Sequence, residues 1–381
     1  MQQTPLNSAT LSNQFKATDK LRGVNLGGWL VLEKWMTPSL FAGLAATDET
    51  TWCAELGAAA TAKLQQHWDT FITRDDFLWL HQHGINAVRI PVGHWIFGPG
   101  YPYHRSYGDN RQPFVEGGIA VLDRAFVWAN ELDIRIVLDL HAAPGCQNGF
   151  DNGGIKDVCE WHTQADYREH SLNVLERLAE RYHTQACLQA IEVPNEPRWD
   201  VPTDYLKSYN IDAYQRIRKH CSAANVSVVF HDGFRDYHEY LGFMQAPEFA
   251  NVVFDIHRYQ CFERGDIDSD IYTHMHKAAG VWKTEADGII TQMGMPAYCA
   301  EWSLGLDLKV VSLWAEGPFN HALDQMDSFQ QNTAYRGYAA AQLLTFEKYQ
   351  GWFFWSYKTE TTPAWCFREC VQRGWLPDNF A

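Results

Sequence analysis

The sequence lacks the features that mark membrane-spanning and nucleotide-binding proteins. No window of its 381 residues approaches the 18 consecutive apolar residues that a membrane helix needs. The glycine-rich segment Gly23–Trp29 does not fit the G-x-G-x-x-G dinucleotide pattern, and no Walker sequence occurs. Met1–Lys20 also lacks the basic and apolar regions of a signal peptide. We therefore expect no membrane span, and a cytoplasmic protein unless a leader has been removed from a secreted one.

Positive charge and metal-binding patterns are also scarce. The chain has 31 Lys and Arg against 46 Asp and Glu, a net charge of −15, whereas nucleic-acid binders carry basic patches. It has 16 His, but no HExxH or comparable spacing. We expect no nucleic-acid partner, no metal and no cofactor, and EDTA should leave any activity intact.

The nine cysteines form no CxxC pair, so neither a structural zinc site nor a thioredoxin-like motif is expected. Their odd number leaves at least one thiol unpaired. Two interpretations stay open. The cysteines are buried, reduced thiols of a cytoplasmic protein, or a few of them form disulfides, with Cys366 and Cys370 as the local candidates.

What the chain does contain is an alternation of strand-like and helix-like segments. Eight short β-branched runs predict strands at Leu21–Leu26, Asn86–Val92, Ile134–Leu140, Leu188–Val193, Ser227–His231, Val252–His257, Ala297–Glu301 and Gly351–Trp355. Helical periodicity is found in Asp75–His83, Gly118–Asn130, Asp166–Tyr182, Asp204–Cys221, Asp270–Thr291 and Ser328–Tyr349. Alternating strands and helices are typical of the α/β class, and eight strands are the number that closes a (β/α)₈ TIM barrel. The alternative is an open doubly wound sheet with a second domain.

The chain is longer than a minimal barrel of about 250 residues. We expect an N-terminal extension over 1–20, a single catalytic domain over 21–381, and long βα loops. The longest loops are expected at Val31–Thr73, Gly93–Glu116, Gly145–Gln164 and Asp232–Ala250.

Polar side chains cluster where these strands end, and in a barrel such ends converge on one pocket. Two of them, Glu196 and Glu301, form the carboxylate pair that a glycosidase needs. A neutral acid at Glu196 requires a raised pKa, whereas Glu301 must stay ionised, with Arg89 and Tyr259 as its expected partners. Aromatic residues make up 14% of the chain and include rings beside these positions, which could stack on the C–H faces of a sugar.

Four blocks in order carry a family resemblance: Arg22–Phe41, His141–Gly154, Asn195–Pro197 and His257–Phe262. With them the sequence resembles glycoside hydrolase family 5 of clan A, whose members are retaining (β/α)₈ glycosidases. The resemblance covers about residues 21 to 357 and is greatest to the fungal exo-β-1,3-glucanases.

The resemblance implies roles for particular residues. Glu196 is the implied acid/base and Glu301 the nucleophile. Asn195 would donate to the sugar 2-OH, and Trp355 would form the floor of the −1 subsite. The other implied substrate-site residues are Glu33, Arg89, His141, Phe150, Asp151, Asn152, His257, Tyr259 and Phe262, with Phe150 and Phe262 clamping the substrate beyond the cleavage point.

The implied reaction is retaining hydrolysis of β-1,3-glucan or its oligosaccharides, a neutral partner, with exo release of glucose. Either Gly98–Gly117 or Val31–Trp52 could supply the wall that an exo enzyme needs. The alternatives are an endo-β-1,3-glucanase, a β-glucosidase-like enzyme on other β-glucans or glucosylated lipids, a non-catalytic carbohydrate-binding barrel, and a metal-dependent hydrolase using His141, His162 and His257. The sequence does not determine the oligomeric state.

Overall fold

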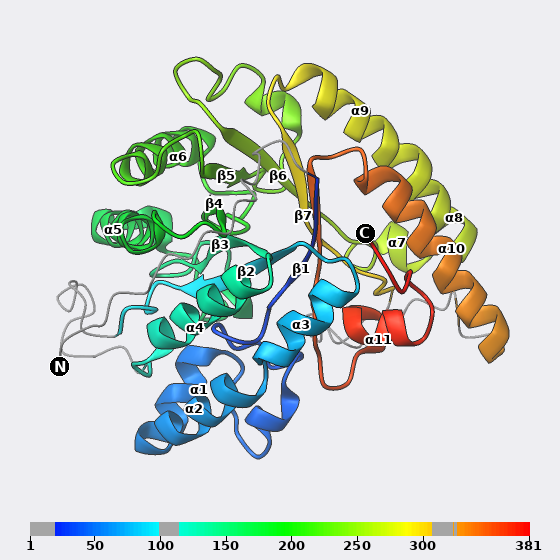
Figure 1. The fold of residues 1–381 in the computed structure, drawn as a ribbon, viewed down its shortest axis with the longest axis horizontal. Coiled ribbons are helices and arrows are strands. Elements are labelled where there is room, and N and C mark those ends of the chain that lie inside the picture. The colour runs from blue at the N-terminus through cyan, green and yellow to red at the C-terminus, as the bar shows by residue number, and fades with distance from the viewer. Residues whose placement is uncertain (1–19, 99–113, 307–322, 324–325) are drawn as a thin grey trace.

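Eight parallel strands close into one barrel in the computed structural model, which describes residues 20–98, 114–306, 323 and 326–381 (Figure 1). The strands follow one another in chain order around the barrel, and the last pairs with the first. They are β1 Leu21–Asn25, β2 Ala87–Gly93, β3 Arg135–Ala142, β4 Leu188–Val193, β5 Ser227–His231, β6 Val252–Arg258, β7 Ala297–Trp302 and β8 Gly351–Phe354. The predicted barrel is thus confirmed, and the open doubly wound sheet is wrong.

Helices surround the strands on the outside of the barrel (Figure 1). The described helices are α1 Glu49–Leu56, α2 Ala60–Thr70, α3 Arg74–Gln82, α4 Gly118–Glu131, α5 Ala165–Tyr182, α6 Thr203–Arg218, α7 Arg264–Ile267, α8 Ile271–His276, α9 Trp282–Gln292, α10 Ser328–Phe346 and α11 Phe367–Gln372. The predicted helix over Asp270–Thr291 is divided, because a π-helical turn at Lys277–Val281 separates α8 from α9. None of the helices in the described residues is long and apolar enough to cross a membrane.

The inside of the barrel is apolar at one level and polar at the next. The apolar level takes at least one inward residue from every strand: Leu21, Ala87, Val137, Ala190, Val229, Val253, Tyr298, Ala300 and Phe353. Because strand side chains alternate with a period of two, the residue two positions further along points into the barrel again. At this second position the sequence places Arg89, Asp139, Glu192, His231 and Asp255. A dry floor therefore lies directly below a cluster of charges.

Glycine is required at two positions where aromatic rings approach the backbone of β1 and the loop after it. A Cβ at Gly23 of β1 would lie 2.3 Å from Cδ1 of Phe353, which belongs to the apolar level. A Cβ at Gly27 would lie 2.9 Å from the ring of Trp355. Both glycines allow an aromatic ring of β8 or its following residue to pack against the backbone of the first strand and loop.

The long loops follow the carboxyl ends of the strands as expected. The segment Val31–Thr73, which was predicted as an insertion, contains α1 and α2. An antiparallel bridge joins Glu33 to Asp48 within it. The other predicted wall, Gly98–Gly117, lies mostly outside the described residues.

Candidate active site

Arg89 is the centre of the polar level. Its side chain is fully buried and projects from β2. It donates to both oxygens of Glu192 at 2.6 and 2.9 Å and forms an ion pair with Asp139 at 3.0 Å. It also donates to the side chains of Asn25, Asn195 and Glu301 at 2.9, 2.7 and 2.8 Å. A buried guanidinium with this many acceptors fixes the positions of the groups around it.

Glu301, at the carboxyl end of β7, is held from two sides. Oε1 accepts from Arg89 Nη1, and Oε2 accepts from the hydroxyl of Tyr259 at 2.8 Å. Both contacts expected from the sequence are thus present. Burial raises the pKa of Glu301 above its ordinary value, and the charges of His257 and Arg89 oppose this only in part.

Glu196 follows β4 and has a left-handed backbone conformation, with φ of +44°. Such a φ is uncommon for a residue with a side chain and is often found at functional positions. Its Oε1 is 2.7 Å from Nδ1 of His257, and its Oε2 accepts from Asn152 at 3.3 Å. Only 6% of Glu196 is exposed.

The expected raised pKa of Glu196 is wrong for the free site. Burial acts to raise it, but the hydrogen bond and the positive charge of His257 outweigh burial, so the pKa of Glu196 is lowered. The sequence argument counted burial and the neighbouring carboxylate. It missed a cation in direct contact.

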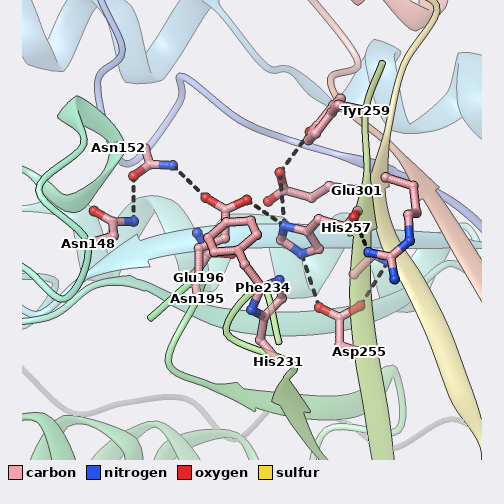
Figure 2. Close-up of polar contacts among 12 residues, drawn as sticks. Asn148, Asn152, Asn195, Glu196, His231, Phe234, Asp255, His257, Tyr259 and Glu301 are labelled. Atoms are coloured by element: carbon pink, nitrogen blue, oxygen red, sulfur yellow. Dashed lines mark hydrogen bonds and ion pairs between the residues drawn. The ribbon is translucent and has the colours of Figure 1, made fainter. Parts of the chain in front are cut away.

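His257 of β6 connects the two carboxylates (Figure 2). Its Nδ1 lies 2.7 Å from Glu196 and 3.4 Å from Glu301, and its Nε2 lies 3.0 Å from Asp255. Burial lowers the pKa of His257, yet the charges of Glu301 and Asp255 more than compensate and hold it well above the ordinary value. The imidazole is therefore the protonated group at the centre of the site.

The same geometry limits the distance between the two glutamates. Since an oxygen of each lies within 3.4 Å of one nitrogen, these two oxygens are no more than about 6 Å apart. Retaining glycosidases hold their carboxyl groups about 5–5.5 Å apart, and inverting ones about 6.5–9.5 Å apart. The arrangement fits the retaining geometry.

Several buried polar atoms of the site have no protein partner within the described part of the chain. Besides Asp139 Oδ1 and His231 Nε2 of the charged level, they include Asn195 Nδ2, His141 Nε2 and Glu33 Oε1. His141 is oriented by Asp139 Oδ2 at 2.6 Å from Nδ1, and its ring stacks on Trp355 at 5.2 Å between centroids. Glu33 accepts from Trp35 Nε1 through its other oxygen at 2.9 Å. Buried polar atoms are normally hydrogen-bonded, so these three indicate a place for a polar ligand.

The loop after β3 supplies the next group of predicted residues. Asn152 donates to Glu196 and is itself held by Asn148 at 3.0 Å. Asp151 is buried, and burial raises its pKa to about 6. Phe150, just before them, is half-buried. Across the site, Phe262 is 42% exposed and packs edge-on against Tyr259 at 5.5 Å.

Sequence reasoning missed the groups below the two glutamates. Glu192 and Asp255 contact Arg89 and His257, and the ring of His231 lies 4.3 Å from that of His257. The signal was available. Asp255 precedes His257 by two residues, and Asp139 precedes His141 by two, so each pair faces the barrel interior.

Two groups of side chains are close enough to hold a metal ion: Glu196, His231 and His257, and Glu192, Asp255 and His257. Both sets share His257, whose two ring nitrogens already contact Glu196 and Asp255. A cation would have to displace the proton that makes these contacts. The donor set therefore fits an acid–base cluster better than a metal centre.

A closed (β/α)₈ barrel with paired glutamates at the carboxyl ends of β4 and β7 defines a glycoside hydrolase. The cellulase family, glycosyl hydrolase family 5, matches residues 51–359. The chain belongs to this family.

Similar proteins agree with this assignment. The chain is 37% identical to the "Probable glucan 1,3-beta-glucosidase A" of Aspergillus fumigatus, over 94% of this chain and 87% of that relative. It is 33% identical to the "Glucan 1,3-beta-glucosidase" of Blumeria graminis, over 98% and 90%. Among solved structures, the rutinosidase from Aspergillus niger superposes with a TM-score of 0.75 at 21% identity, over 94% of this chain and 98% of that one, which shows the shared fold.

Proposed function

We propose that this enzyme is a retaining exo-hydrolase of β-1,3-linked glucan or its oligosaccharides, releasing glucose. One observation carries the proposal. An oxygen of Glu196 and an oxygen of Glu301 both contact Nδ1 of His257, so the two carboxyl groups are close enough to each other for double displacement. The names of the fungal relatives support the β-1,3-glucoside linkage.

Glu301 is the nucleophile of the first step. Arg89 and Tyr259 each donate to one of its oxygens, which favours the ionised form and aims the carboxylate. It attacks the anomeric carbon from the face opposite the leaving oxygen, and the glycosidic C–O bond breaks as the glucosyl–enzyme bond forms.

Glu196 protonates the leaving oxygen. In the free site the proton is held on Nδ1 of His257, 2.7 Å from Glu196. It crosses this hydrogen bond as negative charge develops on the glycosidic oxygen. In the second step Glu196 takes a proton from the attacking water, and glucose leaves with its β configuration retained.

The unpartnered polar atoms bind the glucosyl unit. Asn195 Nδ2 donates to the 2-OH, His141 Nε2 and Glu33 Oε1 bond to other hydroxyls, and the ring of Trp355 forms the floor. Hydrogen bonds to the 2-OH strengthen in the transition state. These contacts are hydrogen bonds and ring stacking, and none of them requires a charged substrate, so they suit an uncharged sugar.

Exo action is favoured by the β1 loop. Glu33 is 4% exposed and the bridge from Glu33 to Asp48 holds this part of the loop against the site. Early product analysis on laminarin tests the proposal, with glucose alone expected. A ladder of oligosaccharides would favour the endo alternative, and a preference for cellotriose, gentiobiose or a glucosylceramide would change the assigned linkage or aglycone.

Variants of the two glutamates test the mechanism. Glu301→Gln should abolish turnover while leaving binding intact. Glu196→Gln should lower the rate on laminarioligosaccharides by about 10²–10⁴-fold, because general acid catalysis contributes about that much. For a dinitrophenyl glucoside, whose leaving group needs no proton, kcat/KM should fall far less, whereas kcat should still fall because the second step needs Glu196 as its base.

Glu49→Gln is the matched control. Glu49 is buried and accepts from the backbone of Leu32, and burial raises its pKa to about 8. Its amide should leave both rates unchanged. Wild-type product appearing first as α-glucose in proton NMR, or near-normal turnover by Glu301→Gln, would overturn the retaining assignment.

A further inference from the structure

Trp199 stands apart from the other tryptophans. It is 58% exposed, whereas every other tryptophan of the described chain is buried or half-buried. It lies three residues after Glu196, in the loop at the carboxyl end of β4. The exposed indole lies on the face that carries the catalytic pair. Because it is not packed in the core, folding alone does not explain an apolar surface at this position.

Phe234 from the neighbouring β5 loop extends this surface. Its ring centroid is 6.5 Å from that of Trp199 at 66°, and it is 42% exposed. Its φ is +58°, an unfavourable conformation for a bulky residue, and the N–H of Phe234 donates to Asp232 Oδ1 at 2.7 Å. The backbone strain at Phe234 holds its ring in solvent, where the ring adds little to the core. Such strain is often found at binding sites, so it indicates a binding role for Phe234.

The pair is connected directly to the acid/base. The ring of Phe234 packs edge-on against His231 at 5.2 Å, and His231 packs against His257 at 4.3 Å. His257 in turn bonds to Glu196, as Figure 2 shows. Two ring contacts and one hydrogen bond therefore connect this aromatic surface to Glu196, which protonates the leaving oxygen.

Both loops are fixed in place. Arg235 Nη2 donates to the carbonyl of Trp199 at 3.0 Å and Nη1 to that of Gly233 at 3.0 Å. Arg198 and Asp200, on either side of Trp199, form a bidentate ion pair at 2.6 and 2.9 Å. A rigid apolar ring flanked by exposed polar groups has the chemistry of a sugar-binding surface, since a glucosyl unit presents a C–H face edged by hydroxyls.

We propose that Trp199 and Phe234 form a platform for the leaving portion of the substrate, with Trp199 under the second glucosyl unit beyond the cleaved bond. Glu196 protonates the leaving oxygen, so the leaving portion must extend from the β4 side of the site. The inference rests on the function proposed above and adds a preference for longer substrates.

Substrate length is the test. In Trp199→Ala, kcat/KM on laminaritriose and laminaritetraose falls about tenfold, the loss of one favourable ring contact. Laminaribiose and 4-nitrophenyl β-glucoside do not reach Trp199, so kcat/KM on them stays within about twofold. Trp199→Phe keeps an aromatic face and restores most of the loss.

Leu344→Ala is the control, because Leu344 is 73% exposed near the end of α10 that leads into β8, at the opposite end of the barrel. It should change none of these values. An equal loss of Trp199→Ala on all four substrates, or no loss on any, overturns the platform. A wild-type enzyme inactive on every β-1,3-linked substrate would instead contradict the proposed function.

Discussion

At the scale of single residues, the chemistry depends on one imidazole between three carboxylates. The sequence placed Glu196, Glu301 and His257 at strand ends, and a barrel brings strand ends together. It could not give the order of their pKa values, because that order depends on which nitrogen of His257 meets which oxygen. Only the structure shows that Nδ1 is shared by both glutamates while Nε2 contacts Asp255.

Replacing Asp255 by Asn should therefore move the pH profile. Asp255 helps to raise the pKa of His257, and its own pKa is about 6, so it is ionised when His257 titrates. Without the negative charge of Asp255 the pKa of His257 falls. The imidazolium then loses its proton at a lower pH than in the wild type. The alkaline limb of kcat/KM on laminaribiose should shift to lower pH by about one unit.

The control for this shift is Asp236→Asn. Asp236 forms the same kind of contact, 2.6 Å from Nδ1 of His238, but at the surface. Its replacement should leave the profile in place. An alkaline limb of Asp255→Asn that stays at the wild-type position, or moves upward, would show that the proton used in catalysis is not held by His257.

At the scale of elements, the strands could be predicted better than the loop helices. All eight predicted strands occur, because a strand buried on both faces is a short apolar run with few other interpretations. The helices α1 and α2 were missed within Val31–Thr73. Their signals were local: Asp48 and Thr51 form a capping box, and residues 57–62 are rich in Ala.

The N-cap residues of α1 and α8, Asp48 and Asp270, are expected to differ in their contribution to stability. Asp48 accepts from the backbone N–H of Thr51 at 2.8 Å and also from that of Lys156 at 3.2 Å, which joins the β1 loop to the β3 loop. The side chain of Asp270 accepts from the backbone N–H of Thr273 at 2.8 Å, and its backbone contacts lie in the first turn of its own helix. Asp270→Ala should lower the free energy of unfolding by about 1 kcal/mol, the usual value of a cap.

Asp48→Ala should lower it by about 2 kcal/mol, because a second hydrogen bond in a buried place is lost with the cap. Urea unfolding of the two variants beside the wild type measures both. Equal losses would mean that the contact with Lys156 does not join the two loops energetically.

At the scale of the whole molecule, the alternation of the barrel interior explains both fold and site. Leu21, Val137 and Phe353 belong to the dry floor, and residues two positions after floor residues, such as Arg89 and Glu192, form the charged level. This layering follows from the sequence once the strands are known. The meeting of distant loops does not, since Trp199 and Phe234 come together only through the order of β4 and β5 in the barrel.

The same whole-molecule packing sets the state of the nine cysteines, all of which lie in described parts of the chain. None of the nine forms a disulfide, and all but Cys159 are buried, so the disulfide interpretation with Cys366 and Cys370 is wrong. Burial raises the pKa of Cys146 to about 11 and of Cys187 to about 12, which keeps them as unreactive thiols near neutral pH.

A thiol count tests this arrangement. In the folded protein, Ellman's reagent at pH 8 should react only with Cys159, and slowly, since partial burial raises the pKa of this thiol as well. After denaturation without a reductant, all nine thiols should react. Cys159→Ser, the control, should remove the reaction of the folded protein and reduce the count after denaturation by one. Fewer than nine thiols in the denatured wild type would reveal a disulfide and contradict this arrangement.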